Sequence, residues 1–120
     1  MKKMLKTVMV VDDEEHNRVT VQNILESNGY NVVTAVDGDD CLKKLKKMKP
    51  ALILMDVMMP GTPVSVVVRE IPEIKVAYFT VMRASDAQKS VLTSAENVVG
   101  FIQKPFHLNT FIKKIKKLVG

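Results

Sequence analysis

Short apolar runs alternate with longer amphipathic segments along this chain. Four runs have the length and the Val, Ile, Leu and Met content of buried parallel strands: Thr7–Val11, Ala51–Met55, Val76–Phe79 and Val99–Ile102. A shorter run, Asn31–Ala35, is expected to be a further strand. Strict alternation of strand and helix predicts an α/β fold with a five-stranded, doubly wound parallel sheet and helices on both faces.

The helices between these strands are predicted from their periodicity and their end signals. Asn28-Gly29 suits a left-handed cap, and Asp37 suits an N-cap. We expect the third helix to be short or irregular, because a run of three Val residues is a weak helix former and Pro72 ends it. The expected helices cover Glu15–Ser27, the Lys-rich segment from Asp37 to before Pro50, Val64–Ile71, Ser85–Ala95 and Leu108–Leu118.

Length and composition indicate one compact domain, residues 1–120, with 47% hydrophobic and 26% charged residues. No apolar stretch reaches the roughly 20 residues that a membrane span needs. The amino terminus has no signal-peptide pattern, so we expect a cytoplasmic protein. Cys41 lies beside Leu42 on an amphipathic segment and is expected to be a small core residue.

The formal charge of +5 raises the question of nucleic-acid binding. The lysines of the second and last helices alternate with apolar residues, which is typical of solvated helix faces opposite a buried stripe. The chain has no Trp and two Tyr, and it lacks the mixture of basic and aromatic residues that single-strand binding uses. We therefore expect no direct contact with nucleic acid.

Polar residues follow four of the apolar runs: Asp12-Asp13, Asp56, Thr80 and Lys104-Pro105. Ligands bind at the carboxyl ends of strands in such sheets, so these residues should converge on one site. Three carboxylates together repel each other unless a cation neutralises them, and Mg²⁺ suits such oxygen ligands. A phosphoryl group could then bind there, with Asp56 as a candidate nucleophile and the Thr80 hydroxyl as a hydrogen-bond donor to the product.

Four motifs, in this order, resemble those of the receiver domain of two-component response regulators: Val10-Val11-Asp12-Asp13, Met55-Asp56-Val57-Met58-Met59-Pro60-Gly61, Phe79-Thr80 and Gln103-Lys104-Pro105-Phe106. The resemblance covers the whole chain. It implies a flavodoxin-like fold with strand order 2-1-3-4-5.

The resemblance also implies roles for individual residues. Asp56 would accept a phosphoryl group from a histidine kinase. The Mg²⁺ ligands would be Asp12, Asp13, Asp56 and the backbone carbonyl of Met58. Thr80 and Lys104 would bind the phosphoryl oxygens. Phe101 matches the switch aromatic that turns inward when the threonine moves, and the Lys104-Pro105 bond is expected to be cis.

These roles imply a signalling switch that catalyses only its own phosphoryl transfer and dephosphorylation. The expected output is a changed surface of the fourth helix, fifth strand and last helix, about Ser85 to Lys117, which regulates a partner protein. The Lys-rich last helix suggests a partner with acidic groups. A stand-alone receiver of this kind is expected to be a monomer or a phosphorylation-dependent dimer.

Some positions depart from the family pattern. The stretch from Asp56 to Thr80 is shorter than usual, and Val81 stands where a small residue is common. Met58 and Met82 flank the site without a group that positions water, so we expect slow loss of phosphate.

Three other functions are relevant to the same residues. A degenerate receiver, which binds partners without phosphorylation, stays open. A flavodoxin fits poorly because the acidic first loop repels a phosphate. A phosphatase of the haloacid dehalogenase type needs an Asp where Met58 stands.

Overall fold

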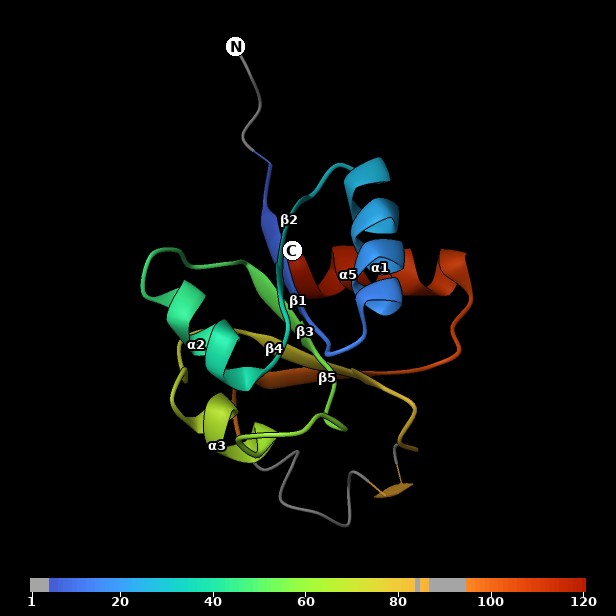
Figure 1. Ribbon diagram of the computed structural model, residues 1–120. Helices are drawn as coiled ribbons and strands as arrows, with labels where there is room; N and C mark the ends of the chain where they lie inside the picture. The colour runs from blue at the N-terminus through green and yellow to red at the C-terminus, as the bar shows by residue number, and fades with distance from the viewer. Residues whose placement is uncertain (1–4, 84, 87–94) are drawn as a thin grey trace.

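The computed structural model describes residues 5–83, 85–86 and 95–120. The five strands form one parallel sheet, as the alternation of strand and helix predicted, with the order β2-β1-β3-β4-β5 that the family resemblance implied (Figure 1). The strands are β1 Thr7–Val11, β2 Asn31–Ala35, β3 Leu52–Met55, β4 Val76–Thr80 and β5 Val98–Gln103. The described helices are α1 Glu15–Ser27, α2 Gly38–Leu45, α3 Val64–Arg69 and α5 Leu108–Val119.

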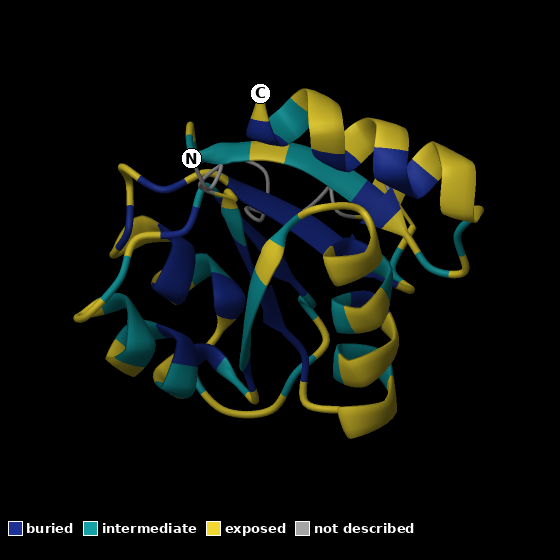
Figure 2. Ribbon diagram, turned by 90° about the horizontal axis from the view of Figure 1, so that it is seen from above, coloured by how far each residue is buried: buried dark blue, intermediate teal, exposed yellow. Residues whose placement is uncertain are grey.

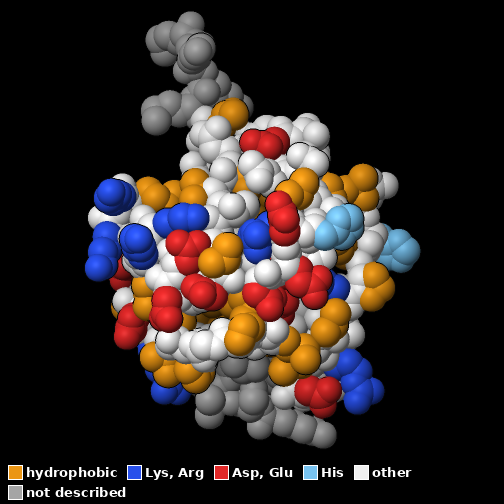
Figure 3. Space-filling view, in the orientation of Figure 1, with side chains coloured by type: hydrophobic (Ala, Val, Ile, Leu, Met, Phe, Trp, Pro, Cys, Tyr) orange, Lys and Arg blue, Asp and Glu red, His pale blue; other side chains and the backbone are white. Residues whose placement is uncertain are grey.

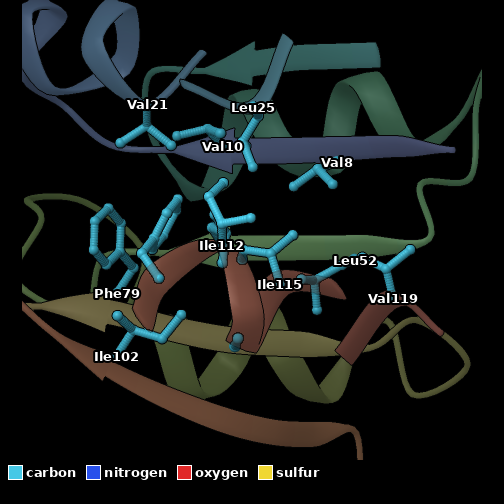
Figure 4. Packing of buried hydrophobic residues seen from close by; sticks show 13 residues of the cluster. Val8, Val10, Val21, Leu25, Leu52, Phe79, Ile102, Ile112, Ile115 and Val119 are labelled. Atoms are coloured by element: carbon cyan, nitrogen blue, oxygen red, sulfur yellow. The ribbon is translucent and has the colours of Figure 1, made fainter. Parts of the chain in front are cut away.

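Helices cover both faces of the sheet, and each face has its own apolar cluster (Figures 1 and 2). Helices α1 and α5 pack on one face, where Leu25, Leu54, Phe111 and Ile115 are buried together. Figure 4 shows how side chains of the strands and of α5 meet in this cluster. On the other face, α2 and α3 pack over a second cluster that contains Tyr78. Central strands buried on both faces explain the continuous apolar runs in the sequence.

Two predicted caps are present. Asn28 ends α1, and Gly29 follows with a φ of 90°, a left-handed conformation that glycine adopts readily. The side chain of Asp37 accepts a hydrogen bond from the backbone N–H of Asp40 and caps α2.

The second helix ends earlier than predicted, at Leu45 rather than just before Pro50. The N–H groups of Lys46 and Lys47 bond to carbonyls three residues back, which tightens the last turn and closes the helix. Like charges three and four residues apart on the Lys-rich segment oppose further helix, and Pro50 disfavours helical geometry in the residue before it.

The third helix is short, as expected, with six residues from Val64 to Arg69. Most of the span predicted for a fourth helix, between Ser85 and Ala95, lies outside the described residues. Among the residues that are described, no helix has the length and apolar character needed to cross a membrane.

Candidate functional site

The register of the sheet brings the strand ends together. Val11 pairs with Met55 across β1 and β3, and Thr80 pairs with Gln103 across β4 and β5. The residues that follow these strands therefore emerge at one edge. Figure 3 shows acidic side chains gathered across the middle of one face of the molecule, with hydrophobic side chains among them.

Three carboxylates form a compact acidic cluster at this edge. One oxygen atom from each of Asp12, Asp13 and Asp56 lies within 4.8 Å of the others. Asp12 is buried, Asp13 is exposed and Asp56 is half-buried. The backbone N–H of Glu14 donates to Asp12 Oδ1 at 2.9 Å, and that of Met58 donates to Asp56 Oδ1 at 3.0 Å. These bonds fix both carboxylates and place the Met58 backbone beside Asp56.

One ammonium group enters the acidic cluster. The Nζ atom of Lys104 lies 2.6 Å from Asp12 Oδ2 and 3.5 Å from Asp56 Oδ2, and the Lys side chain is only 13% exposed. Three carboxylates against one ammonium leave about two negative charges when all four groups are ionised. Oxygen ligands with this charge balance suit a hard divalent cation such as Mg²⁺.

Thr80 lies at the end of β4 and is fully buried. Its hydroxyl accepts a hydrogen bond from the Met82 N–H at 3.4 Å, and its carbonyl accepts one from the Lys104 N–H at 2.8 Å. The second bond joins the end of β4 to the segment after β5. The Lys104-Pro105 peptide bond is cis.

A pocket of about 640 Å³ opens over the acidic cluster. Its floor contains charged groups, whereas part of its wall is apolar. Met58 and Val81 are exposed there, with 56% and 58% of their surface accessible. The residues that line the pocket are Asp13, Glu14, Asn17, Asp56, Met58, Val81, Lys104, Pro105 and Phe106.

Phe101 lies away from this pocket, on β5. It pairs with Tyr78 of β4 and packs, half-buried, against the apolar cluster under α2 and α3. The structure thus gathers Asp12, Asp13, Asp56 and Lys104 in one cluster. Thr80 lies at the same sheet edge, and Phe101 lies farther back along β5.

Two residues at the site were missed from the sequence. Arg18 of α1 donates to the backbone carbonyl of Asp12 at 2.7 Å and ties the acidic loop to the helix. The ring of Phe79 lies under Lys104, with its centroid 4.8 Å from Nζ. The position of Phe79 directly before Thr80, on the opposite face of the strand, was the available signal.

Comparisons with known proteins give the family of the chain. A family model of the response regulator receiver domain matches residues 8–116. The chain is 32% identical over 118 residues to the alkaline phosphatase synthesis transcriptional regulatory protein PhoP of Bacillus subtilis, with 97% of this chain and 49% of PhoP covered. It is 30% identical over 120 residues to the chemotaxis protein CheY of Bacillus subtilis, with 98% and 100% covered. The chain therefore spans about half of PhoP and the full length of CheY.

Solved structures show the same fold. The response regulator protein TrrA of Thermotoga maritima, in complex with Mg(2+)-BeF, has a TM-score of 0.83 and 29% identity, over 95% of this chain and 99% of TrrA. The chemotaxis response regulator CheY4 of Vibrio cholerae also has a TM-score of 0.83, with 26% identity over 96% and 99% of the two chains.

Proposed function

This chain belongs to the response regulator receiver domain family, and we propose on that basis that it is a phosphorylation-dependent switch in which Asp56 accepts a phosphoryl group from a histidine kinase. The observation that carries the proposal is the acidic cluster with its ammonium group. Oxygens of Asp12, Asp13 and Asp56 lie within 4.8 Å of one another, and Lys104 Nζ contacts two of these carboxylates.

In the proposed reaction, a carboxylate oxygen of Asp56 attacks phosphorus. The new O–P bond gives an acyl phosphate, while the P–N bond of the donor phosphohistidine breaks and leaves its electron pair on the imidazole nitrogen. Lys104 and the Thr80 hydroxyl hold the transferred oxygens by charge and hydrogen bonding. Beyond this transfer and the later hydrolysis of the acyl phosphate, which restores the Asp56 carboxylate and releases inorganic phosphate, we expect no catalysis.

The residues present fit a Mg²⁺ ion. Asp12, Asp13, Asp56 and the Met58 carbonyl would hold it, because carboxylate and carbonyl oxygens are its preferred protein ligands. When bound, the ion neutralises charge on the carboxylates and on the phosphoryl oxygens. The Mg(2+)-BeF complex of TrrA supports this assignment, since that relative has the same fold.

We propose that Thr80 and Phe101 convert phosphorylation into a change of surface. The hydroxyl accepts only a long bond, 3.4 Å from the Met82 N–H, and its own O–H can donate to a phosphoryl oxygen. When the hydroxyl moves toward the phosphoryl group, the half-buried ring of Phe101 turns inward. Two discrete arrangements of these side chains make a two-state switch.

The proposed partners are a histidine kinase at the pocket and a downstream protein at the β5 and α5 surface. Most of the fourth-helix part of this surface lies outside the described residues. Exposed lysines of α5, such as Lys113 and Lys117, favour a partner with acidic groups. We further propose that residues 1–120 act as one cytoplasmic receiver domain, monomeric or dimeric on phosphorylation, without direct contact with nucleic acid or membrane.

A titration with Mg²⁺ and beryllofluoride, which mimics a phosphoryl group, tests the switch. Backbone amide resonances of Thr80, Phe101 and Lys104 should shift in the wild type and stay in place in Asp56→Asn. Shifts confined to the acidic loop would contradict the coupling to Phe101.

A degenerate receiver is the second candidate function. Two observations favour it: Val81 lines the pocket with an exposed branched side chain where a small residue is common in the family, and α3 has only six residues. Such a module would bind its partner equally well with and without beryllofluoride, whereas a switch would not. A pull-down under both conditions separates the two candidates.

A further inference from the structure

We propose that Phe79 is a positioning residue for Lys104, and that its ring keeps the ammonium group at the inner end of the site for phosphoryl binding. This inference rests on the phosphoryl-acceptor function proposed above. The Nζ atom lies over the ring, 4.8 Å from its centroid. An ammonium group in this position is attracted by the negative face of the aromatic ring.

The placement of Phe79 follows from strand alternation. Successive residues of a strand point to opposite faces, and β4 ends in Phe79-Thr80. Phe79 belongs to the apolar cluster under α1 and α5, while its other neighbour, Tyr78, belongs to the opposite cluster. The end of β4 therefore supplies a hydroxyl to the site from one face and an aromatic ring from the other.

The contact of Lys104 with the ring differs from its two carboxylate contacts in its response to a metal ion. The carboxylates of Asp12 and Asp56 hold Nζ at 2.6 and 3.5 Å, but a divalent cation would compete for the same oxygens. Such a cation does not compete for the Phe79 ring. The ring contact could therefore persist if the carboxylates bound a metal ion. It would then keep the long, flexible side chain of Lys104 within reach of a phosphoryl group.

Two further rings lie beside Phe79 in the core cluster. Its centroid lies 5.4 Å from that of Phe106 and 5.3 Å from that of Phe111, and these two rings are 4.7 Å apart. Figure 4 shows Phe79 beside Ile102 at one end of the core cluster. Phe106 also lines the pocket, so the aromatic group joins the site to the core under α5.

A double-mutant cycle tests the role. Phe79→Leu removes the ring but keeps an apolar side chain, and it should slow phosphorylation by acetyl phosphate roughly threefold. The same change should have no effect in a Lys104→Ala background. Phe111→Leu is the matched control, because it removes a ring of the same cluster that does not contact Lys104.

A second readout does not depend on phosphorylation. The ε-methylene protons of Lys104 should resonate upfield in the wild type with Mg²⁺ bound, through the ring current of Phe79, and should return toward ordinary values in Phe79→Leu but not in Phe111→Leu. Ordinary shifts in the wild type would overturn the inference without any variant.

Other outcomes separate the inference from the proposed function. Equal rate losses in Phe79→Leu and Phe111→Leu, or an undiminished Phe79→Leu effect without Lys104, would overturn the positioning role alone. A wild-type chain that takes up no phosphoryl group would overturn the proposed function and the inference together.

Discussion

Met58 lies beside the proposed phosphoryl acceptor, and its side chain cannot orient water. Its N–H bonds to Asp56 Oδ1 at 3.0 Å, which places the exposed thioether at the pocket. Water attacks an acyl phosphate faster when a polar group holds it in line. A phosphorylated form of this chain should therefore lose its phosphate slowly.

Replacing Met58 by Asn should speed that loss on the order of tenfold, because the amide can hold an attacking water molecule. Intact mass recorded at intervals after removal of the phosphodonor measures the decay. Met58→Leu is the control, since it stays apolar at similar size. A half-life of only seconds in the wild type, or equal decay in the two variants, would contradict the account.

Cys41 and Tyr78 make the free energy of unfolding depend on pH in the alkaline range. Burial raises the pKa of Cys41 from 9.0 to about 12 and that of Tyr78 from 10.0 to about 12. Both groups bind protons more tightly in the folded state, so their contribution is complete below pH 9 and is lost as the pH rises toward 12. The free energy of unfolding should be flat near neutral pH and fall above pH 9.

Urea denaturation at pH 7, 9 and 10.5 measures this dependence. Cys41→Ala should lose less stability over the same range, because one of the two groups is gone. Identical slopes for wild type and variant would show that the buried thiol does not contribute.

At the residue scale, the sequence located the acidic pair, Asp56 and Lys104 because each directly follows an apolar strand. Arg18 and Phe79 were missed for a physical reason: each acts through a contact that only the tertiary arrangement creates. The Arg18 contact is to a backbone carbonyl, and the Phe79 contact is to an ammonium group 25 residues away in the chain. Neither residue differs from an ordinary helix or core residue when read alone.

Helices α2 and α3 meet at a glycine. A Cβ atom added at Gly38 would lie 2.7 Å from Val67 Cγ2, closer than packed atoms come. Val67 is fully buried, so it has little space to move away. Gly38 therefore permits the close approach of the short α3 to the start of α2.

Gly38→Ala should lower the free energy of unfolding by about 1–3 kcal/mol through overpacking. In a Val67→Ala background, where the colliding methyl groups are absent, the same change should cost little. Urea denaturation of the two single variants and the double variant gives the coupling. Additive losses of stability would mean that the close contact with Val67 is not the reason for a glycine at position 38.

At the element scale, the strands followed from apolar runs, and the caps at Asp37 and Asn28 followed from local chemistry. The strand order came from the resemblance to receiver domains. The predicted end of α2 lay several residues beyond the observed one. Apolar periodicity continues to Met48, whereas the backbone closes its last turn at Lys47. Helix ends depend on such competition between backbone bonds and charge, which periodicity does not report.

On the scale of the molecule, parallel register turns scattered residues into one site. Acidic groups gather at the carboxyl ends of the strands, whereas most lysines of α2 and α5 are solvated opposite buried stripes. The sequence predicted this separation from the alternation of Lys with apolar residues. The positive net charge is therefore spread over helix faces, and the site itself is acidic.

Mg²⁺ should stabilise the folded chain through the acidic cluster. A ligand that binds only the folded state at ten times its Kd adds about 1.4 kcal/mol to the free energy of unfolding. The gain should vanish in Asp13→Asn and persist in Glu15→Gln, which removes an exposed charge outside the cluster. Denaturation with and without Mg²⁺ measures it, and an equal gain in both variants would indicate non-specific screening.

The most direct test of the central claim is intact mass after incubation with Mg²⁺ and acetyl phosphate, for wild type and Asp56→Asn side by side. If Asp56 is the acceptor, the wild type gains one phosphoryl group and the variant gains none. No addition in the wild type, or equal addition in both, would contradict Asp56 as the phosphoryl acceptor.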